Sequence, residues 1–161
     1  MFTNNKKNKL ADEPHLDKEF LEISEKMSEI YKDTIQDETN HTAYQCIKNL
    51  INQKIQGNIV ECGVWRGEKI SVFLETLNRL DVKNRDIYII DTFSGMTEPG
   101  ANDLQVITQK KMIEGDMNAS LEIVKNNIYK TDYPREKLHF IKIDVRNQND
   151  LKNSLVGDIA L

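Results

Sequence analysis

Residues 57–67 read Gly57-Asn58-Ile59-Val60-Glu61-Cys62-Gly63-Val64-Trp65-Arg66-Gly67, and this stretch decides the fold of the chain. Residues 58–62 are mostly apolar and β-branched, which is typical of a short buried strand in a parallel sheet. Gly63 and Gly67 punctuate the turn that follows, and glycine there allows positive φ and lets a ligand lie directly on the main chain. A helix is predicted from about residue 68 to residue 80, with its free N–H groups facing the turn. The three parts together predict a nucleotide-type pocket.

The rest of the chain alternates helical and strand patterns around this unit. Helices are predicted at residues 16–32, 42–53, 118–129 and 147–155, and strands at 86–91, 138–144 and from 158 onward. Strands separated by single helices form βαβ crossovers, which pair parallel and right-handed. The predicted fold class is therefore α/β, with a Rossmann-like parallel sheet and flanking helices. A polar break is predicted at 33–40, and the long loop at 92–108 is interpreted as a mobile cover over a site.

The predicted organisation has three parts: a disordered N-terminus at 1–14, N-terminal helices at 15–56, and a cofactor-binding half-domain at 57–161. The chain ends on Val156-Gly157-Asp158-Ile159-Ala160-Leu161, which reads as an apolar strand just beginning. We therefore expect a fragment that is truncated after the start of the fourth strand, with the C-terminal half of the domain absent. A short natural edge strand is the alternative.

Composition restricts the partners and the compartment. The chain has 22 basic and 26 acidic residues, which argues against a nucleic-acid-binding surface. It lacks an apolar run of the roughly 20 residues that a membrane span requires, and it lacks the apolar segment of a signal peptide. Cys46 and Cys62 make neither a disulfide framework nor a zinc spacing, so the expected location is cytoplasmic.

Acidic residues stand at the ends of three successive predicted strands: Glu61, Asp91 and Asp144. Ligands of open parallel sheets bind at the carboxyl ends of the strands. Asp91 is placed to accept hydrogen bonds from both ribose hydroxyls of a nucleoside, and Asp144 from an adenine amine. Glu61 is placed to face an ammonium group, directly or through water. Ribose, adenine and an amino-acid ammonium together describe S-adenosylmethionine.

Each residue also has a structural interpretation. Asp91 is compatible with a loop-start acid, Asp144 with an Asx turn, and Cys62 with a small core residue. Glu61 has fewer harmless explanations, because an unpaired buried carboxylate is costly. The three histidines, at 15, 41 and 139, show no metal spacing and are interpreted as structural or exposed.

A dinucleotide site fits the turn less well. The Rossmann fingerprint is Gly-x-Gly-x-x-Gly, whereas this turn places Trp65 where the middle glycine would stand. The loss of that glycine obstructs the approach of a pyrophosphate, and S-adenosylmethionine has none. A P-loop is excluded because its Gly-Lys-Ser/Thr ending is missing.

The string at residues 59–67, followed by Asp91-Thr92-Phe93-Ser94-Gly95-Met96, resembles the macrocin O-methyltransferase family. Residues 120–124 and the third strand leading into Asp144 and Val145 are similar more loosely. That family includes S-adenosylmethionine-dependent enzymes that methylate sugar hydroxyls on macrolide antibiotics. The resemblance implies a class I methyltransferase fold and these cofactor-binding residues: Glu61, Cys62, Gly63, Val64, Gly67, Asp91, Thr92, Phe93, Asp144 and Val145.

The resemblance also implies Mg²⁺ dependence, with the metal-ligating aspartates and the catalytic residues beyond Leu161 and no metal ligand within the chain. The expected function is O-methylation of a hydroxyl on a sugar or glycosylated metabolite, with residues 1–161 inactive alone. The expected partner is a small-molecule or glycan acceptor, and a homo-oligomer stays open. Two alternatives remain: a non-catalytic nucleotide-binding or assembly module, and an NAD(P)-dependent oxidoreductase.

Overall fold

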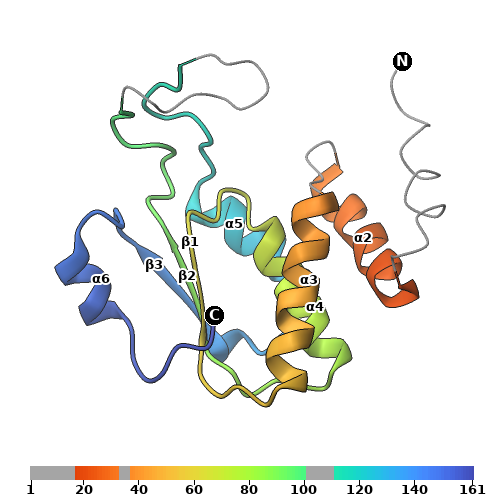
Figure 1. The fold of residues 1–161 in the computed structure, drawn as a ribbon. Helices are drawn as coiled ribbons and strands as arrows, with labels where there is room; N and C mark the ends of the chain where they lie inside the picture. Colours follow the sequence, from red (N-terminus) through yellow and green to blue (C-terminus); the bar gives the residue numbers. More distant parts are fainter. Residues whose placement is uncertain (1–16, 33–36, 101–110) are drawn as a thin grey trace, which may run out of the picture.

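The computed structural model describes residues 17–32, 37–100 and 111–161, which form a parallel sheet with helices on both faces (Figure 1). The predicted disorder of residues 1–14 lies outside the described part of the chain. The elements in chain order are α2 (Lys18–Tyr31), α3 (Asp37–Asn52), β1 (Ile59–Cys62), α4 (Glu68–Arg79), β2 (Ile87–Asp91), α5 (Leu121–Ile128), the 3₁₀ helix η2 (Arg135–Lys137), β3 (Leu138–Lys142) and α6 (Gln148–Ser154). The α/β fold class and the predicted alternation of elements are confirmed.

The sheet has the strand order β1-β2-β3, and both pairings are parallel. On the free side of β1, Asn58 forms a parallel bridge with Ile159. There the backbone N–H of Asn58 donates to the carbonyl of Asp158 at 2.7 Å, and that of Val60 donates to Leu161 at 2.7 Å. Residues 158–161 therefore begin a fourth strand beside β1, as predicted. The strand order reverses at β1, and in such sheets ligands bind where the order reverses.

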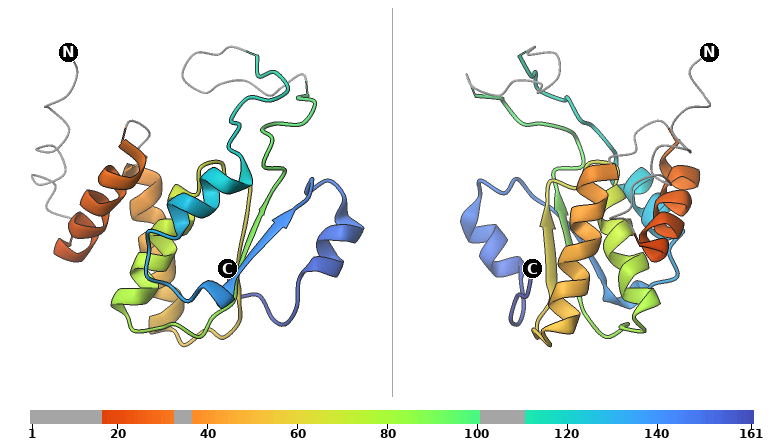
Figure 2. Two further views of the ribbon diagram at one scale, coloured as in Figure 1. Left: turned by 180° about the vertical axis from the view of Figure 1, so that it is seen from behind. Right: turned by 45° about the vertical axis from the view of Figure 1, so that its right-hand side comes forward.

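The helices are divided between the two faces of the sheet. Helices α2, α3, α4 and α5 cover one face, and α6 lies on the other (Figure 2). Alternate strand residues such as Ile59, Ile87 and Ile89 are fully buried against the first group, together with Ile70 and Leu74 of α4. No helix in the described ranges is long and apolar enough to cross a membrane.

The N-terminal helices pack on this same core. The buried face of α2 contributes Phe20, Ile23, Met27 and Tyr31 to the main apolar cluster. Helix α3 begins at Asp37, so the predicted polar break was wrong for residues 37–40. Asn40 is only 1 % exposed, and its side-chain amide donates to Glu68 Oε1 at 2.6 Å. Asn40 therefore joins the first turn of α3 to the polar beginning of α4.

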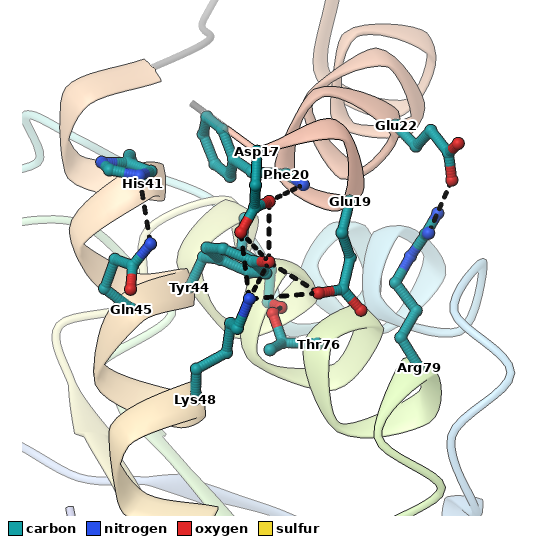
Figure 3. Close-up of polar contacts among 11 residues, drawn as sticks. Asp17, Glu19, Phe20, Glu22, His41, Tyr44, Gln45, Lys48, Thr76 and Arg79 are labelled. Carbon is teal, nitrogen blue, oxygen red and sulfur yellow. Dashed lines mark hydrogen bonds and ion pairs between the residues drawn. The ribbon is translucent and has the colours of Figure 1, made fainter. Parts of the chain in front are cut away.

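A polar cluster joins the start of α2 to α3 (Figure 3). Asp17 caps α2, because its Oδ1 accepts from the backbone N–H of Phe20 at 2.9 Å. The Tyr44 hydroxyl lies 2.8 Å from both carboxylate oxygens of Asp17 and 2.6 Å from Glu19 Oε2. Lys48 donates to that hydroxyl at 2.7 Å and to Asp17 at 3.0 Å. Burial, followed by the hydrogen bond to Glu19, raises the pKa of Tyr44 above its usual value, so the hydroxyl stays protonated.

Replacement of the Tyr44 hydroxyl is expected to loosen α2. Tyr44→Phe removes a donor to the carboxylates and an acceptor for Lys48, so we expect the free energy of unfolding to fall by about 1–2 kcal/mol. Urea unfolding measures this change. The matched control is Tyr129→Phe, because the Tyr129 ring stacks against Arg135 and Phe140 through its face and edge. The control is expected to change stability by less than about 0.5 kcal/mol. Equal losses in the two variants would contradict the role given to the cluster.

Candidate functional site

The candidate site lies at the carboxyl ends of β1 and β2, where the glycine turn leads into α4. Gly63 has φ +77°, Trp65 has φ +47° and Gly67 has φ +86°, so the turn uses positive φ at three positions. The N–H of Gly63 donates to the carbonyl of Ile90 at 2.8 Å, which continues the ladder between the two strands. Left-handed backbone at a non-glycine residue such as Trp65 is uncommon and needs support from its surroundings.

Asp91 supplies that support. Its Oδ2 accepts from the backbone N–H of Val64 at 2.8 Å and of Trp65 at 3.1 Å, and its Oδ1 accepts from Phe93 at 2.9 Å. The Thr92 hydroxyl has a single hydrogen, and its shorter contact is with the carbonyl of Gly95 at 2.7 Å. One carboxylate therefore holds the turn after β1 against the turn after β2, and Oδ1 keeps one acceptor position. The sequence did not predict this contact between the two turns.

Glu61 is a buried carboxylate with an unsatisfied oxygen. The residue is 8 % exposed, Oε1 lies 3.1 Å from Lys69 Nζ, and Oε2 is buried without a hydrogen-bond partner. Burial raises the pKa of Glu61, and the nearby negative charge of Asp91 raises it further, whereas Lys69 lowers it. The two carboxylates therefore lie on one side of the sheet and influence each other. A buried acceptor of this kind is costly unless a donor reaches it.

The raised pKa of Glu61 predicts a pH-dependent stability in the absence of ligand. In the unfolded chain a glutamate has a pKa of about 4.3, and the folded state holds the proton to higher pH. The folded state therefore binds more protons, and the free energy of unfolding falls as pH rises from that value through the folded-state pKa. Glu61→Gln removes this loss, so the variant should gain stability relative to the wild type as pH rises above about 4.3.

Glu22→Gln provides a control of opposite sign. The hydrogen bond from Arg79 is the largest cause that lowers the pKa of Glu22, so its contribution to stability grows as pH rises through the lowered folded-state pKa and is complete above the unfolded value. The Glu22→Gln variant should therefore be less stable than the wild type by a constant amount above the unfolded pKa, and this deficit should shrink at lower pH. Urea titrations at several pH values measure both trends. A Glu61→Gln curve parallel to that of the wild type would contradict the assignment.

The two turn glycines have different surroundings. A Cβ added at Gly63 would meet no atom within 4 Å, so open space lies beside the main chain there. A Cβ added at Gly67 would approach the side chain of Ile128 to 3.0 Å and that of Val124 to 3.4 Å. Gly63 thus borders the space that a ligand would occupy, whereas Gly67 allows α5 to pack closely on the start of α4.

The side chains of four other predicted cofactor-binding residues are buried in the core, bonded to their own loop or directed to the other face of the sheet. The side chains of Val64 and Phe93 are 5 % exposed and belong to the apolar core. Thr92 holds its own loop through Gly95. Cys62 is exposed and follows Glu61 directly in β1, so its side chain points to the opposite face of the sheet.

The third predicted contact is arranged differently from the first two. β3 ends at Lys142, and the Asp144 carboxylate accepts from its neighbour Arg146, through Nη2 at 2.7 Å and Nε at 3.0 Å. These hydrogen bonds lower the pKa of Asp144 to about 2. The adjacent Val145 is 41 % exposed, so an apolar side chain stands in solvent after β3. The backbone N–H of Arg146 also donates to Asp144 Oδ1 at 3.0 Å, which is the Asx turn that the sequence left as an alternative.

The loop after β2 is tied at its base. The N–H of Met96 donates to the carbonyl of Asp116 at 2.8 Å, and the N–H of Gly115 donates to Met96 at 2.9 Å. The two arms of this loop rise from the carboxyl end of the sheet in Figure 1. Residues 101–108 of the predicted mobile cover lie outside the described part of the chain. Across the described ranges, no group of three or more His, Cys, Asp or Glu residues could hold a metal ion.

Comparison with known proteins identifies the family. The family described as Macrocin-O-methyltransferase (TylF) matches residues 2–154. This chain belongs to the macrocin O-methyltransferase family. It is 28 % identical over 101 residues to a demethyldecarbamoylnovobiocin O-methyltransferase of Streptomyces niveus, which covers 60 % of this chain and 38 % of that protein. It is also 28 % identical over 99 residues to 8-demethyl-8-(2,3-dimethoxy-alpha-L-rhamnosyl)-tetracenomycin-C 4'-O-methyltransferase of Streptomyces olivaceus, with the same two coverages.

Solved structures agree with the family assignment. The O-methyltransferase NovP superimposes with a TM-score of 0.54 at 26 % identity, covering 66 % of this chain and 45 % of NovP. The calicheamicin methyltransferase CalS11 superimposes with a TM-score of 0.53 at 18 % identity, covering 86 % of this chain and 64 % of CalS11, and this likeness concerns the fold. This member of the macrocin O-methyltransferase family spans about 38 % of the length of the curated relatives it matches. The family resemblance and the methyltransferase fold predicted from the sequence are confirmed.

Proposed function

We propose that this chain is the cofactor-binding part of an S-adenosylmethionine-dependent O-methyltransferase that acts on a hydroxyl of a sugar or glycosylated metabolite. The observation that carries the proposal is the buried, unpartnered Oε2 of Glu61 beside the open space at Gly63. A bound ligand with a cationic donor would satisfy that oxygen. The names of the relatives, novobiocin and rhamnosyl-tetracenomycin O-methyltransferases, support the acceptor class.

The residues present fit S-adenosylmethionine. Glu61 offers a buried carboxylate to the ammonium group, directly or through water, and the open backbone at Gly63 lets the ligand pass. Asp91 keeps one acceptor position on Oδ1 for a ribose hydroxyl while its other positions hold the turn. Val145 offers an apolar surface to the adenine ring. We do not assign the adenine amine to Asp144, because Arg146 engages that carboxylate.

The sulfonium of the cofactor supplies an electrophilic methyl group. The residues of this chain would bind and orient the cofactor, and orientation is a large part of the catalysis of a direct displacement. The described residues do not fit a magnesium site. If the protein uses Mg²⁺, we propose that the ligands lie beyond Leu161. The catalytic base is proposed to lie there too, and residues 1–161 are expected to show little or no turnover alone.

Product analysis tests the proposed activity. The full-length protein is incubated with methyl-labelled S-adenosylmethionine and a panel of glycosides that differ in one sugar hydroxyl, and products are analysed by mass spectrometry. The expected result is a labelled methyl ether on one sugar oxygen. Residues 1–161 are assayed in parallel as the matched control. Turnover by residues 1–161 at the full-length rate, or transfer only to nitrogen or carbon acceptors, would contradict the proposal.

A non-catalytic nucleotide-binding module is the second candidate, and an Asp-rich metal-binding segment after Leu161 would decide for the enzyme. An NAD(P)-dependent oxidoreductase is disfavoured because Trp65 stands in the turn with its backbone N–H bound to Asp91.

We also propose that the protein is cytoplasmic, because Cys46 and Cys62 are both free thiols.

A further inference from the structure

A cavity of about 330 Å³ lies at the amino ends of the strands. The turn between α3 and β1 and the turn between α4 and β2 form it, and both turns lie at the bottom of Figure 1, away from the glycine turn. The volume is in the range of small-ligand sites. None of the residues proposed above for the cofactor lines this cavity.

The polar lining of the cavity is cationic. Lys54 and Arg85 contribute the charges, and the amides of Gln56, Asn58 and Asn84 add neutral polar groups. No Asp or Glu is among the residues that line the cavity. The site therefore presents two positive charges and several hydrogen-bond donors without an internal counter-charge.

Arg85 is the central group because it is buried without an anion. The residue is 9 % exposed, and its guanidinium donates to the carbonyls of Gly57 at 2.5 Å and Ile55 at 2.6 Å. Burial lowers the pKa of Arg85. Both acceptors are neutral, and within residues 17–32, 37–100 and 111–161 no carboxylate forms an ion pair with Arg85. An arginine has five N–H donors, so three remain after these two bonds. A desolvated cation of this kind favours an anionic partner.

Acidic residues close in sequence do not supply that partner. Asp86 follows Arg85 directly, but its carboxylate binds His139 at 2.8 Å and Lys137 at 3.3 Å. Asp158 pairs with Asn58 through its backbone carbonyl and does not line the cavity.

We propose that this cavity binds a small anion through a phosphate or carboxylate group. Arg85 and Lys54 donate charge-assisted hydrogen bonds to the anion, and the side-chain amides complete its coordination. The site is separate from the proposed cofactor pocket, because it lies at the amino ends of the strands and the cofactor pocket lies at their carboxyl ends. The site would bind either the free anion or a metabolite that carries the same phosphate or carboxylate group.

An amide NMR titration of the full-length protein tests this site. Inorganic phosphate and acetate are added separately at an ionic strength held constant with sodium chloride. We expect saturable shifts confined to residues 54–58 and 82–85 with at least one of the two anions, and the tighter anion identifies the head group as phosphoryl or carboxyl. Lys54→Gln should weaken that binding at least about fivefold, through the loss of one charge-assisted hydrogen bond.

The variants separate binding from folding. Arg85 also holds the turn, so Arg85→Lys can change the fold, whereas no described contact requires the Lys54 side chain. Lys152→Gln on α6 removes an equal charge away from the cavity and should leave the dissociation constant unchanged. Absence of saturable shifts with both anions would overturn the proposal, as would equal binding by Lys54→Gln and the wild type. Shifts confined to residues 61–67 would also overturn it, because they would place the anion at the cofactor turn.

Discussion

Gly63→Val is expected to weaken the binding of S-adenosylhomocysteine, the product of the methyl donor, by at least about 100-fold, or roughly 2.7 kcal/mol. A side chain at this position would enter the open space beside the turn, where no protein atom lies within 4 Å. The valine side chain would therefore displace the ligand and would contact little of the protein. Positive φ at a β-branched residue adds strain, so the free energy of unfolding should also fall by about 1–3 kcal/mol.

Gly157→Val separates these two effects. Gly157 has φ +81°, close to the +77° of Gly63, and lies beside Asn58 at the amino end of β1. The control should therefore lose a similar amount of stability and keep its affinity for S-adenosylhomocysteine. Calorimetric titration and urea unfolding measure the two quantities on both full-length variants. Equal losses of affinity would mean that strain alone explains the effect of Gly63→Val.

Asp91→Ala is expected to destabilise the protein by about 3–5 kcal/mol and to abolish detectable cofactor binding. The substitution removes the charged acceptor of three backbone N–H groups, those of Val64, Trp65 and Phe93. The turn after β1 would lose its connection to the turn after β2, and the left-handed conformation of Trp65 would lose its support. The free energy of unfolding is measured in urea, and binding is measured by calorimetry.

Asp116→Ala is the matched control for Asp91→Ala. Asp116 is also a loop carboxylate, but it accepts one backbone N–H, from Ile113 at 3.0 Å. Its replacement should lower the free energy of unfolding by about 1 kcal/mol or less. If Asp91→Ala were no more harmful than Asp116→Ala, the carboxylate of Asp91 would not be holding the two turns together.

The sequence predicted the sheet and the turn because their signals are local. Apolar runs, two glycines and strand-end acids lie within residues 57–67 and 86–91, and they specify a strand, a turn and a crossover without reference to distant residues. The buried state of Glu61 followed from its place in an apolar strand. The separate roles of Gly63 and Gly67 did not follow, because the contact of Gly67 with Ile128 depends on the packing of α5.

The features that were missed depend on tertiary contacts. The first turn of α3 contains Asn40, whose hydrogen bond to Glu68 joins residues 28 positions apart. The role of Asp91 depends on backbone groups 26 and 27 positions away. Asp144 is a different case: its partner Arg146 is two residues on, and an Asp-x-Arg pattern after a strand was a signal for a local ion pair.

We propose that the turn after β1 and the carboxylates of Glu61 and Asp91 hold S-adenosylmethionine. Calorimetric titration of the full-length protein with S-adenosylhomocysteine and, separately, with NAD tests it most directly, with Glu61→Gln as the comparison. We expect binding of S-adenosylhomocysteine without binding of NAD. Glu61→Gln should bind S-adenosylhomocysteine at least about tenfold more weakly, since the variant loses a charge-assisted hydrogen bond to the ammonium group. Binding of NAD without S-adenosylhomocysteine, or equal affinity of Glu61→Gln and the wild type for S-adenosylhomocysteine, would contradict it.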